Sequence, residues 1–543
     1  MRMRWSNRSR ISPPAPEEVL REMRGKPKIL LLTPPFVQLN TPYPATPTLT
    51  GFLRSRGYRV EQRDLSIETA LAVLRTYGDE LTDEFLEILQ NPALPPEAKR
   101  GAAEYMDALA ASIRDEVDGD FGFSRYAEKL GASLPDFSAV LARLRRRSAV
   151  DRILEDLVAG LIEEMRPDCV GVTCPFPGTL LGAFRIAKTV KRLAPSTVTV
   201  LGGGYVNTEL RDMTDRRPYR FFDCIMFDDG CANWVELLEG RRGCEVPPFV
   251  KPDYSGLDMS LYFDVPETDN PMHRLWSCGK WIKLQLARGC YWRKCAFCDV
   301  TLDYIKRFEM PDASTVVDAM QELGEDFHFT DEALPPALVE KVCREIVRRR
   351  FRCRWWGNIR FDRSYTPELA RLMARAGCIA VTGGLECAHD RLLKLMNKGI
   401  TLASAREALR SFRDAGIMAH AYLMYAFPTE TEREARLALS YVRGLFRENL
   451  VQSAFFHRFA LTVHSPVFRD PGRFGIEVPD LDGVKSSRLF ALNEVPYVEA
   501  SAPDWDRIGR ALKLALYNYM EGRGLSKSAA FWFDAVRQGE GSR

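Results

Sequence analysis

The feature that most constrains the fold is the repeated alternation of short apolar runs with amphipathic helical segments. Residues 28–33 (Lys-Ile-Leu-Leu-Leu-Thr) form a continuous apolar run, typical of a strand buried on both faces, and Pro34-Pro35 ends it. Comparable runs follow at 58–60, 169–173, 198–201 and 224–227. Alternation of this kind predicts βαβ units that build an open parallel sheet of about five strands.

A long stretch without strand signals interrupts this first sheet. Residues from about 67 to 150 carry apolar side chains at helical spacing, for example Leu71, Leu74, Leu141 and Leu144. The pattern predicts a helical block inserted between two strands of the sheet.

The alternation restarts in the second half of the chain. Thr366-Pro367 is a good helix start, because threonine caps helix N-termini and proline fits the first helical position. Strands are expected at 281–287, 327–330, 352–356, 379–382, 418–425 and 453–460. Six βα units predict a partial or complete parallel barrel with its active site at the carboxyl edge of the strands.

These patterns divide the chain of 543 residues into several parts. We expect an N-terminal tail over 1–25, a sheet domain over 26–243, a linker over 244–275, a barrel over 276–475, and a mostly helical region over 476–543.

Composition narrows the class of protein. Hydrophobic residues make up 46% and charged residues 27%, as in ordinary globular enzymes, and the net charge of +3 provides no field for nucleic acid. No signal peptide and no apolar run of membrane-spanning length is visible. Thirteen scattered cysteines, an odd number, therefore indicate reduced thiols in a cytoplasmic protein with no membrane partner.

Three of these cysteines are clustered directly after the first barrel strand. Cys290, Cys295 and Cys298 lie within nine positions, and three thiolates on one loop can hold three irons of a four-iron cluster and leave the fourth open. Structural zinc is the alternative, but zinc prefers four closed ligands and only Asp299 is adjacent.

Further motifs accompany the cysteines. They are Thr330-Asp331-Glu332-Ala333-Leu334-Pro335, Gly383-Gly384-Leu385-Glu386, Leu395-Met396-Asn397-Lys398-Gly399 and Phe427-Pro428-Thr429-Glu430-Thr431. With them the chain resembles the radical S-adenosylmethionine (SAM) superfamily, and specifically its cobalamin-dependent members, over about residues 28–470. It departs from the usual pattern by leaving four residues between the first two cysteines and by placing Thr429 where glycine is usual.

The resemblance implies roles around the cysteines. Cys290, Cys295 and Cys298 would ligate a [4Fe-4S] cluster, whose unique iron would chelate SAM. The other expected SAM contacts are Phe297 at the adenine, Asp331 or Glu332 near the amine, Arg360 at the carboxylate and Glu386 at the ribose.

The resemblance also implies that the first sheet is a flavodoxin- or Rossmann-like cobalamin-binding domain. Thr173 and the turn Gly202-Gly203-Gly204 would allow close backbone approach of cobalamin at the strand ends, and residues 40–46 could form another wall. No histidine precedes His273, so this domain cannot supply an imidazole ligand to cobalt.

The chain is therefore interpreted as a cobalamin-dependent radical SAM enzyme, most simply a methyltransferase acting on an unactivated carbon of an unidentified small molecule or peptide. The resemblance implies that one SAM methylates cobalamin while a second is cleaved to a 5′-deoxyadenosyl radical, with a flavodoxin- or ferredoxin-type reductase as electron donor. Two candidates for proton transfer are His328 and His457. Two alternatives stay open: a radical enzyme that transfers no methyl group, catalysing ring contraction, cyclisation or oxidation, and a cobalamin-binding sensor with a zinc-stabilised domain.

Overall fold

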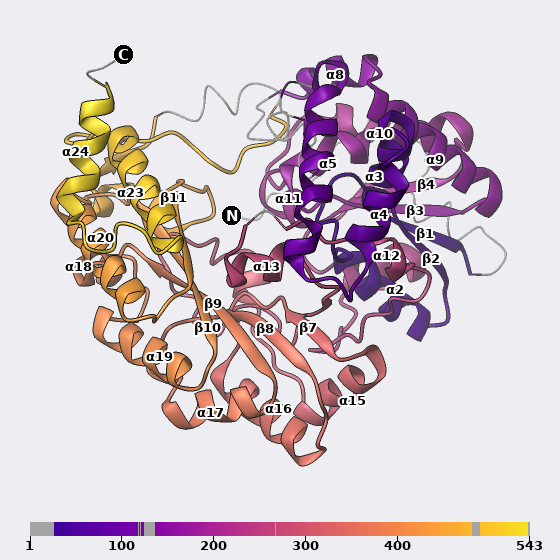
Figure 1. Ribbon diagram of the computed structural model, residues 1–543. Coiled ribbons are helices and arrows are strands. Elements are labelled where there is room, and N and C mark those ends of the chain that lie inside the picture. The colour runs from indigo at the N-terminus through magenta and orange to yellow at the C-terminus, as the bar shows by residue number, and fades with distance from the viewer. Residues whose placement is uncertain are drawn as a thin grey trace.

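The computed structural model describes residues 26–540 apart from 118, 120, 124–135, 267 and 480–488. The expected N-terminal tail, 1–25, lies outside the described residues, as does a part of the expected helical insert. Figure 1 shows two lobes, one coloured indigo to magenta and one salmon to orange, with the yellow C-terminal helices packed on the last strands of the second lobe.

The first lobe is built on a five-stranded, fully parallel sheet. Its strand order is β2-β1-β3-β4-β5, the order of flavodoxin-like doubly wound folds. The strands are β1 (Lys28–Thr33), β2 (Arg59–Asp64), β3 (Cys169–Thr173), β4 (Val198–Gly202) and β5 (Cys224–Ile225). Helices α2 (Ala45–Ser55), α10 (Leu180–Leu193) and α11 (Gly204–Thr208) connect strands, and α12 (Gly230–Glu239) follows β5.

A helical block lies between β2 and β3, where the sequence predicts it. Its helices are α3 (Leu65–Tyr77), α4 (Thr82–Gln90), α5 (Arg100–Ser112), α6 (Arg114–Val117), α8 (Ser138–Arg145) and α9 (Ala149–Met165). Buried side chains of this block, such as Leu71, Met106 and Leu154, share one hydrophobic cluster with strand residues Leu30 and Val170. The block is therefore part of the core of the first lobe.

The second lobe is a partial parallel barrel of six βα units. Its sheet order is β11-β10-β9-β8-β7-β6, so each strand lies next to the strands that precede and follow it in the chain. The strands are β6 (Ile282–Leu284), β7 (Asp326–Phe329), β8 (Arg354–Ile359), β9 (Cys378–Glu386), β10 (Met418–Tyr425) and β11 (Ser453–Arg458). The predicted fold class, a parallel-sheet domain followed by a partial (β/α)6 barrel, is confirmed.

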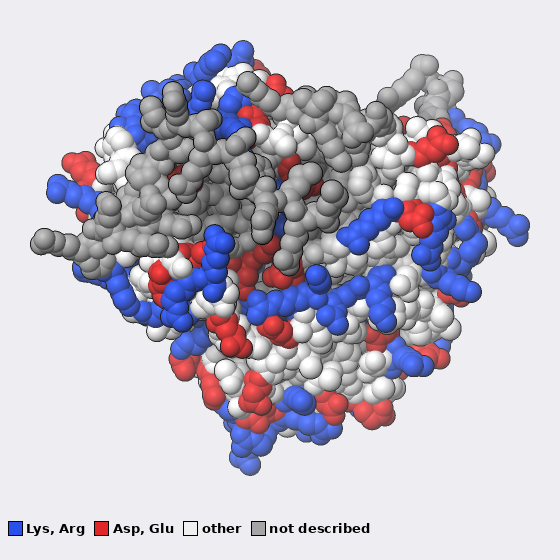
Figure 2. Space-filling model, turned by 180° about the vertical axis from the view of Figure 1, so that it is seen from behind, with Lys and Arg blue, Asp and Glu red and all other residues white. Residues whose placement is uncertain are grey.

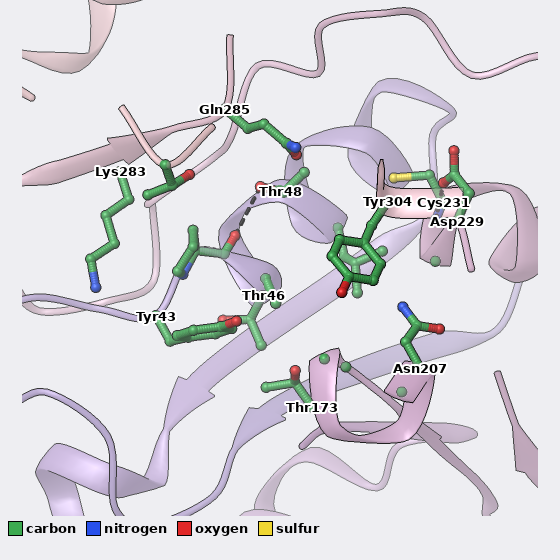
Figure 3. Close-up of a pocket in the computed structure, with 18 of the residues that line it drawn as sticks. Tyr43, Thr46, Thr48, Thr173, Asn207, Asp229, Cys231, Lys283, Gln285 and Tyr304 are labelled. Carbon is green, nitrogen blue, oxygen red and sulfur yellow. Dashed lines mark hydrogen bonds between the residues drawn. The ribbon is translucent and has the colours of Figure 1, made fainter. Parts of the chain in front are cut away.

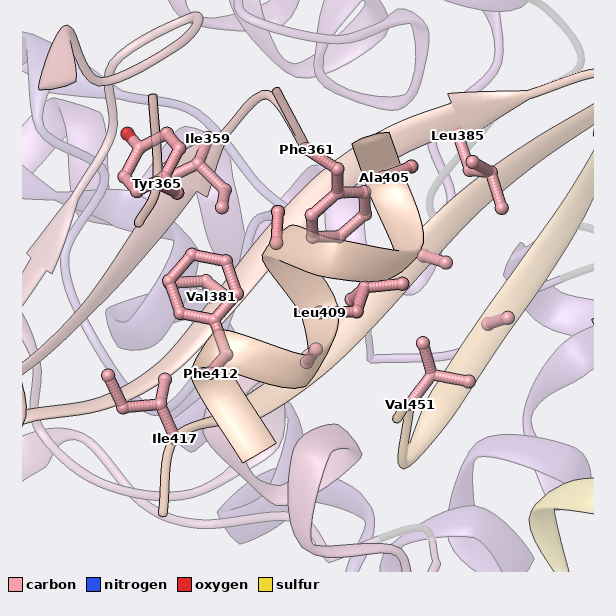
Figure 4. Packing of buried hydrophobic residues seen from close by; sticks show 14 of the residues in the cluster. Ile359, Phe361, Tyr365, Val381, Leu385, Ala405, Leu409, Phe412, Ile417 and Val451 are labelled. Carbon is pink, nitrogen blue, oxygen red and sulfur yellow. The ribbon is translucent and has the colours of Figure 1, made fainter. Parts of the chain in front are cut away.

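Amphipathic helices cover the outside of this barrel. They are α15 (Ala313–Leu323), α16 (Pro336–Arg348), α17 (Pro367–Arg375), α18 (Asp390–Leu395), α19 (Leu402–Asp414) and α20 (Glu432–Arg447), whereas the short helix α14 (Asp303–Lys306) contributes Asp303 and Tyr304 to the cavity between the lobes. Figure 4 shows this packing around α19. Leu409 and Phe412 of that helix belong to the same hydrophobic cluster as Val381 and Leu385 of β9. As predicted, Thr366 caps α17 by accepting a hydrogen bond from the Leu369 amide, and Pro367 is the first helical residue.

Two connecting regions join the lobes. Helix α13 (Pro271–Ser277) precedes β6, and the C-terminal region contains α21 (Pro466–Arg469), β12 (Ile476–Glu477), β13 (Val498–Glu499), α23 (Trp505–Met520) and α24 (Ala529–Glu540). Within that region Phe490 belongs to the core of the first lobe, whereas the amide of Val495 donates to Leu461 of the barrel lobe. Residues 489–495 therefore run as a strap across both lobes.

The described surface carries both signs of charge. Figure 2 shows Lys and Arg interspersed with Asp and Glu over much of the described part of one face, which agrees with the net charge of +3. No helix in the described ranges combines the length and the apolar character needed to cross a membrane.

Candidate functional site

A cavity of about 750 Å³ lies between the two lobes, where the carboxyl ends of both parallel sheets meet. The first lobe contributes Tyr43, Thr46, Thr173 and the turn at Gly202, Gly203 and Gly204. The barrel contributes Lys283, Gln285, His328, Thr330 and Glu332. Figure 3 shows side chains from both lobes converging on this space. Ligands of doubly wound sheets and of parallel barrels bind at such carboxyl edges.

Glycines open the wall on the side of the first lobe. Gly203 has φ +118°, and a Cβ there would lie 2.6 Å from the backbone of Cys174, so only glycine fits. A Cβ at Gly171 would meet the side chains of Trp234 and Leu31 at 2.6 and 2.8 Å. Leu31, Gly171 and Trp234 all line the cavity, which therefore extends as an apolar slot toward the strands.

Two buried hydroxyl groups on this wall have no hydrogen-bond partner. Thr46 and Thr173 are 2% and 6% exposed, and neither Oγ1 is bonded within the described residues. Buried polar groups are normally satisfied, so these two fit a ligand that brings polar groups to the wall. Thr173 and the three glycines, predicted from the sequence as cobalamin contacts, all lie in this wall.

The three cysteines lie on the loop between β6 and α14, with Cys295 buried and Cys290 and Cys298 half-buried. A hydrogen bond from the Cys298 thiol, together with Lys398 and Arg360, holds the pKa of Cys295 well below its ordinary value. Thiolates are the form that binds iron, so the chemistry of this loop suits the predicted cluster.

Asp299, the adjacent candidate for a fourth zinc ligand, is already engaged. Its carboxylate accepts hydrogen bonds from the Thr462 hydroxyl at 2.6 Å and from the Tyr304 hydroxyl at 3.2 Å. In the described ranges no three His, Cys, Asp or Glu side chains form a group that could hold a single metal ion.

Three of the predicted SAM contacts, Arg360, Glu386 and Phe297, lie near Cys295. The Arg360 guanidinium lies 3.8 Å from the Cys295 sulfur and 4.6 Å from the Trp292 ring centre, and it donates to the carbonyl of Lys398. Lys398 in turn pairs with Glu386 at 2.7 Å. Phe297 is half-buried, with the Lys398 ammonium 5.6 Å from its ring centre. Trp292 and Phe297 belong to the cysteine loop itself, whereas Arg360 directly follows β8, Glu386 ends β9 and Lys398 follows α18.

The neighbours Asp331 and Glu332 have different surroundings. Asp331 is fully buried, and its two oxygens accept hydrogen bonds from the amides of Leu286 and Ala287 at 2.9 and 2.7 Å. Glu332 lines the cavity with its side chain exposed to that space, where desolvation by the surrounding walls and the Asp331 carboxylate raise its pKa. Of the two residues predicted to lie near the SAM amine, only Glu332 faces the cavity.

Only one of the two candidate histidines lies at the cavity. His328 lines the cavity and stacks on Trp356, with ring centres 3.5 Å apart, and desolvation lowers its pKa to about 3. His457, on β11, is exposed and is not among the residues that line this cavity. His328 is therefore a neutral imidazole at the cavity wall.

Sequence reasoning missed several residues that the structure brings to the site. Lys283 and Gln38 line the cavity, and Asp229 of the first lobe pairs with Arg288 and Arg307 of the barrel lobe. The sequence offered one signal for Lys283: it is a charged residue within an expected buried strand, where charged residues are rare.

The matched family is the Radical SAM superfamily, whose model aligns with residues 284–442. That range begins in β6 and ends in α20, and it includes the cysteine loop. Residues 284–442, which include most of the barrel, are therefore similar to the radical SAM domain. This result favours an iron–sulfur cluster over zinc and argues against the reading as a binding sensor.

Relatives in sequence include an uncharacterized methyltransferase of Pyrococcus horikoshii and the anaerobic magnesium-protoporphyrin IX monomethyl ester cyclase of Cereibacter sphaeroides. The first is 23% identical and the second 24%, with 54% and 52% of this chain aligned. The alignments cover 69% of the first relative and 50% of the second. The chain therefore matches only part of the length of these curated relatives.

A solved structure covers nearly the whole chain. It is the radical SAM methyltransferase TsrM of Kitasatospora setae, with cobalamin and a [4Fe-4S] cluster bound. The TM-score is 0.52 at 18% identity, with 91% of this chain and 89% of that chain aligned. The likeness shows that this chain has the two-lobed fold of that enzyme.

Proposed function

We propose that the chain is a cobalamin-dependent radical SAM methyltransferase acting on an unactivated carbon of a small molecule or peptide. The observation that carries the proposal is that the carboxyl edges of the two sheets share one cavity. The strand-end turns of the first lobe line one side of it, and the start of the cysteine loop lines the other. TsrM, of the same fold, is a methyltransferase solved with cobalamin bound, and this supports the reading.

Each implied group has residues that suit it. Cys290, Cys295 and Cys298 would hold the cluster, Arg360 and Glu386 would contact SAM, and the wall of Thr173 and Gly202–Gly204 would take cobalamin. When bound, the cluster would supply the electron for reductive cleavage of SAM, and cobalamin would carry the methyl group.

The protein's own side chains would position the substrate and keep water out. Tyr43 and Phe176, whose ring centres lie 5.7 Å apart, form an aromatic edge of the cavity. Glu332 has a pKa of about 7, so its carboxyl group can hold or release a proton near neutral pH. His328, neutral at that pH, can hydrogen-bond but does not carry a charge.

An electron donor would be required in the cell. A small flavodoxin- or ferredoxin-type reductase is the proposed partner, because reductive cleavage of SAM needs single electrons at low potential.

A second candidate keeps both cofactors but transfers no methyl group. It is favoured by the relative from Cereibacter sphaeroides, a cyclase by name, which is as similar to this chain as the named methyltransferase. Cyclisation, ring contraction or oxidation would then be the reaction.

Product analysis separates the two candidates. Under anaerobic turnover with substrate, methyl transfer should yield S-adenosylhomocysteine and 5′-deoxyadenosine at about equal rates, because each cycle uses one SAM for its methyl group and one for its radical. Deuterium from labelled SAM methyl should appear in the product. Formation of 5′-deoxyadenosine and loss of substrate, with no S-adenosylhomocysteine and no label transfer, would establish the second candidate.

A further inference from the structure

A buried cation stands in the wall of the cavity. Lys283 is the central residue of β6 and is 5% exposed, yet it lines the cavity. Among the described residues no carboxylate oxygen lies within 4.0 Å of its ammonium group. Its Nζ donates instead to a neutral amide oxygen, Oε1 of Gln38, at 2.5 Å. Buried charges in proteins are normally paired, so this cation lacks its expected anion.

The position of this cation is fixed by a loop of the first lobe. The Gln38 amide nitrogen donates to the carbonyl of Trp276 at 3.1 Å, so both ends of this side chain are bonded. Nearby, Asn40 donates to the carbonyl of Gly279 and Thr41 to that of Trp281. An ammonium group has three donor hydrogens, and Gln38 accepts only one of them.

Lys283 is charged at neutral pH. Burial lowers its pKa to about 8, which leaves most of the population protonated at pH 7. Asp64 is the acid that raises this pKa, but its carboxylate is bonded to the Tyr262 hydroxyl at 2.8 Å and the Ser66 amide at 3.0 Å. His328, which lies opposite Lys283 on the neighbouring strand β7, is neutral. The cavity therefore presents a positive charge at this point that no carboxylate contacts directly.

An aromatic corner adjoins the cation, because the Trp276 ring is turned by 81° from the Trp356 ring on which His328 stacks. The His328 ring lies parallel to that of Trp356, with an interplanar angle of 8°, and its Nε2 has no partner within the described residues. The Trp276 ring, which also lines the cavity, stands 5.7 Å from that of Trp356. The Tyr43 ring centre is 6.0 Å from the Lys283 ammonium, and Figure 3 shows these two residues on one side of the pocket.

The carboxylate of SAM is not the missing anion. Lys283 lines the cavity, whereas none of the three cysteines is among the residues that line it. The cation beside the cysteine loop is Arg360, which lies 3.8 Å from the Cys295 sulfur. The amides on the corrin ring of cobalamin are neutral, and its one anionic group is the phosphodiester of the nucleotide tail, which the experiment below distinguishes from a carboxylate ligand.

We propose that Lys283 binds the carboxylate of an aromatic acid whose ring lies against His328 and Trp276, and that this acid is the class of substrate of the enzyme. The inference rests on the proposed function, in which the cavity holds the substrate beside the two cofactors. Gln38 is a positioning residue in this scheme, because it holds the ammonium group without contacting the acid.

The test compares two probes of equal shape and different charge, 2-naphthoate and 2-naphthamide. Their binding to anaerobically reconstituted holoenzyme is measured by equilibrium dialysis, with the free probe read by its fluorescence. We expect the carboxylate to bind at least about tenfold more tightly than the amide, as for a charged hydrogen bond in a buried site. Lys283→Met should remove this preference, and Lys283→Arg should retain it. Lys341→Met, at an exposed lysine of α16, is the matched control.

Three outcomes would overturn the proposal. Equal binding of the two probes to the wild-type enzyme overturns the proposal even if the variants fail to fold. A preference that persists in Lys283→Met also overturns it. Loss of bound cobalamin in Lys283→Met with naphthoate binding unchanged would assign the cation to cobalamin, again against the proposal.

Failure of the proposed function gives a different result. Iron, sulfide and cobalamin contents are measured on the same samples. A preparation that binds neither cofactor but prefers naphthoate through Lys283 contradicts the proposed function and supports the acid site. An enzyme that contains iron, sulfide and cobalamin but binds the two probes equally well contradicts the acid site and leaves the proposed function standing.

Discussion

The three cysteines of the loop differ in their surroundings. Cys295 is 6% exposed and lies beside Arg360 and Lys398, whereas Cys290 and Cys298 are half-buried. Two buried cations next to one sulfur stabilise negative charge there, as an anionic thiolate-bound cluster would require.

Replacing Cys290, Cys295 and Cys298 together by alanine should abolish iron binding and 5′-deoxyadenosine formation, because no other cysteines of the chain are spaced as a cluster set. The measurement is iron and sulfide content after anaerobic reconstitution. The matched control replaces Cys244, Cys278 and Cys353, which lie outside this loop, and should retain iron. Wild-type iron content in the first variant would refute the assignment.

Glu430, in the motif at 427–431, is a buried carboxyl group with a raised pKa. It is 3% exposed, and desolvation raises its pKa from 4.5 to about 8, although the Phe427 amide donates to it. The folded chain therefore holds this proton up to a higher pH than the unfolded chain. Between about pH 4.5 and pH 8 the folded state binds more protons, so its stability falls as pH rises through that window.

Glu430→Gln should remove this loss, because the amide is neutral at every pH and can still accept from Phe427. Relative to wild type, the free energy of unfolding of the variant should increase by about 3 kcal/mol between pH 5 and pH 8. Urea midpoints of both proteins across this range measure it. A constant difference between the two proteins at all pH values would contradict the raised pKa.

At the scale of elements, one buried arginine joins three helices of the first lobe. Arg185 of α10 is fully buried, pairs with Asp151 and Glu155 of α9, and donates to the carbonyls of Leu144 and Arg146 at the end of α8. Its guanidinium thus satisfies the last carbonyls of one helix and the charges of another.

Arg185→Met should cost about 3 kcal/mol, because it removes one of the two cations at each of two buried carboxylates and leaves several carbonyls unbonded. We expect a lower Tm and faster proteolysis within α8 and α9. Arg192→Met, at an exposed position of the same helix, should change neither. Equal proteolysis of the two variants would show that the helical block does not depend on this arginine.

The elements themselves were largely readable from the sequence, because buried parallel strands give apolar runs and caps give local signals. The strand expected at 281–287 is shorter, Ile282–Leu284, because the amides of Leu286 and Ala287 donate to Asp331 and leave the ladder. The site was readable only where chemistry-bearing residues are adjacent in sequence, as in the cysteine loop. Lys283 and Gln38 are 245 residues apart, and only the docking of the two lobes brings them together.

At the scale of the whole molecule, the lobes are connected beside the cysteine loop. Asp229, which caps α12 in the first lobe, contacts Arg288, two residues before Cys290, and Arg307 at 3.2 Å. All three side chains are at most 29% exposed, and all three line the cavity. The strap at 489–495 provides a second connection.

The contact at Asp229 should couple the first lobe to the cysteine loop, and Asp229→Asn tests this coupling without removing the cap. Asparagine keeps an oxygen for the amides of Cys231 and Ala232, which Oδ1 of Asp229 accepts at 2.9 and 3.3 Å, but it loses the charge that pairs with the arginines. Amide hydrogen exchange at residues 288–290 should become about tenfold faster, as expected for loss of a partly buried ion pair, while β8 is unchanged. Asp229→Ala should in addition expose the start of α12 to exchange, because the cap is lost. Asp318→Asn, at an exposed pair with Arg349, should leave both segments as in wild type. If Asp229→Asn exchanges like wild type at 288–290, the ion pairs do not hold the loop, and the strap and the Gln38 loop must join the lobes without them.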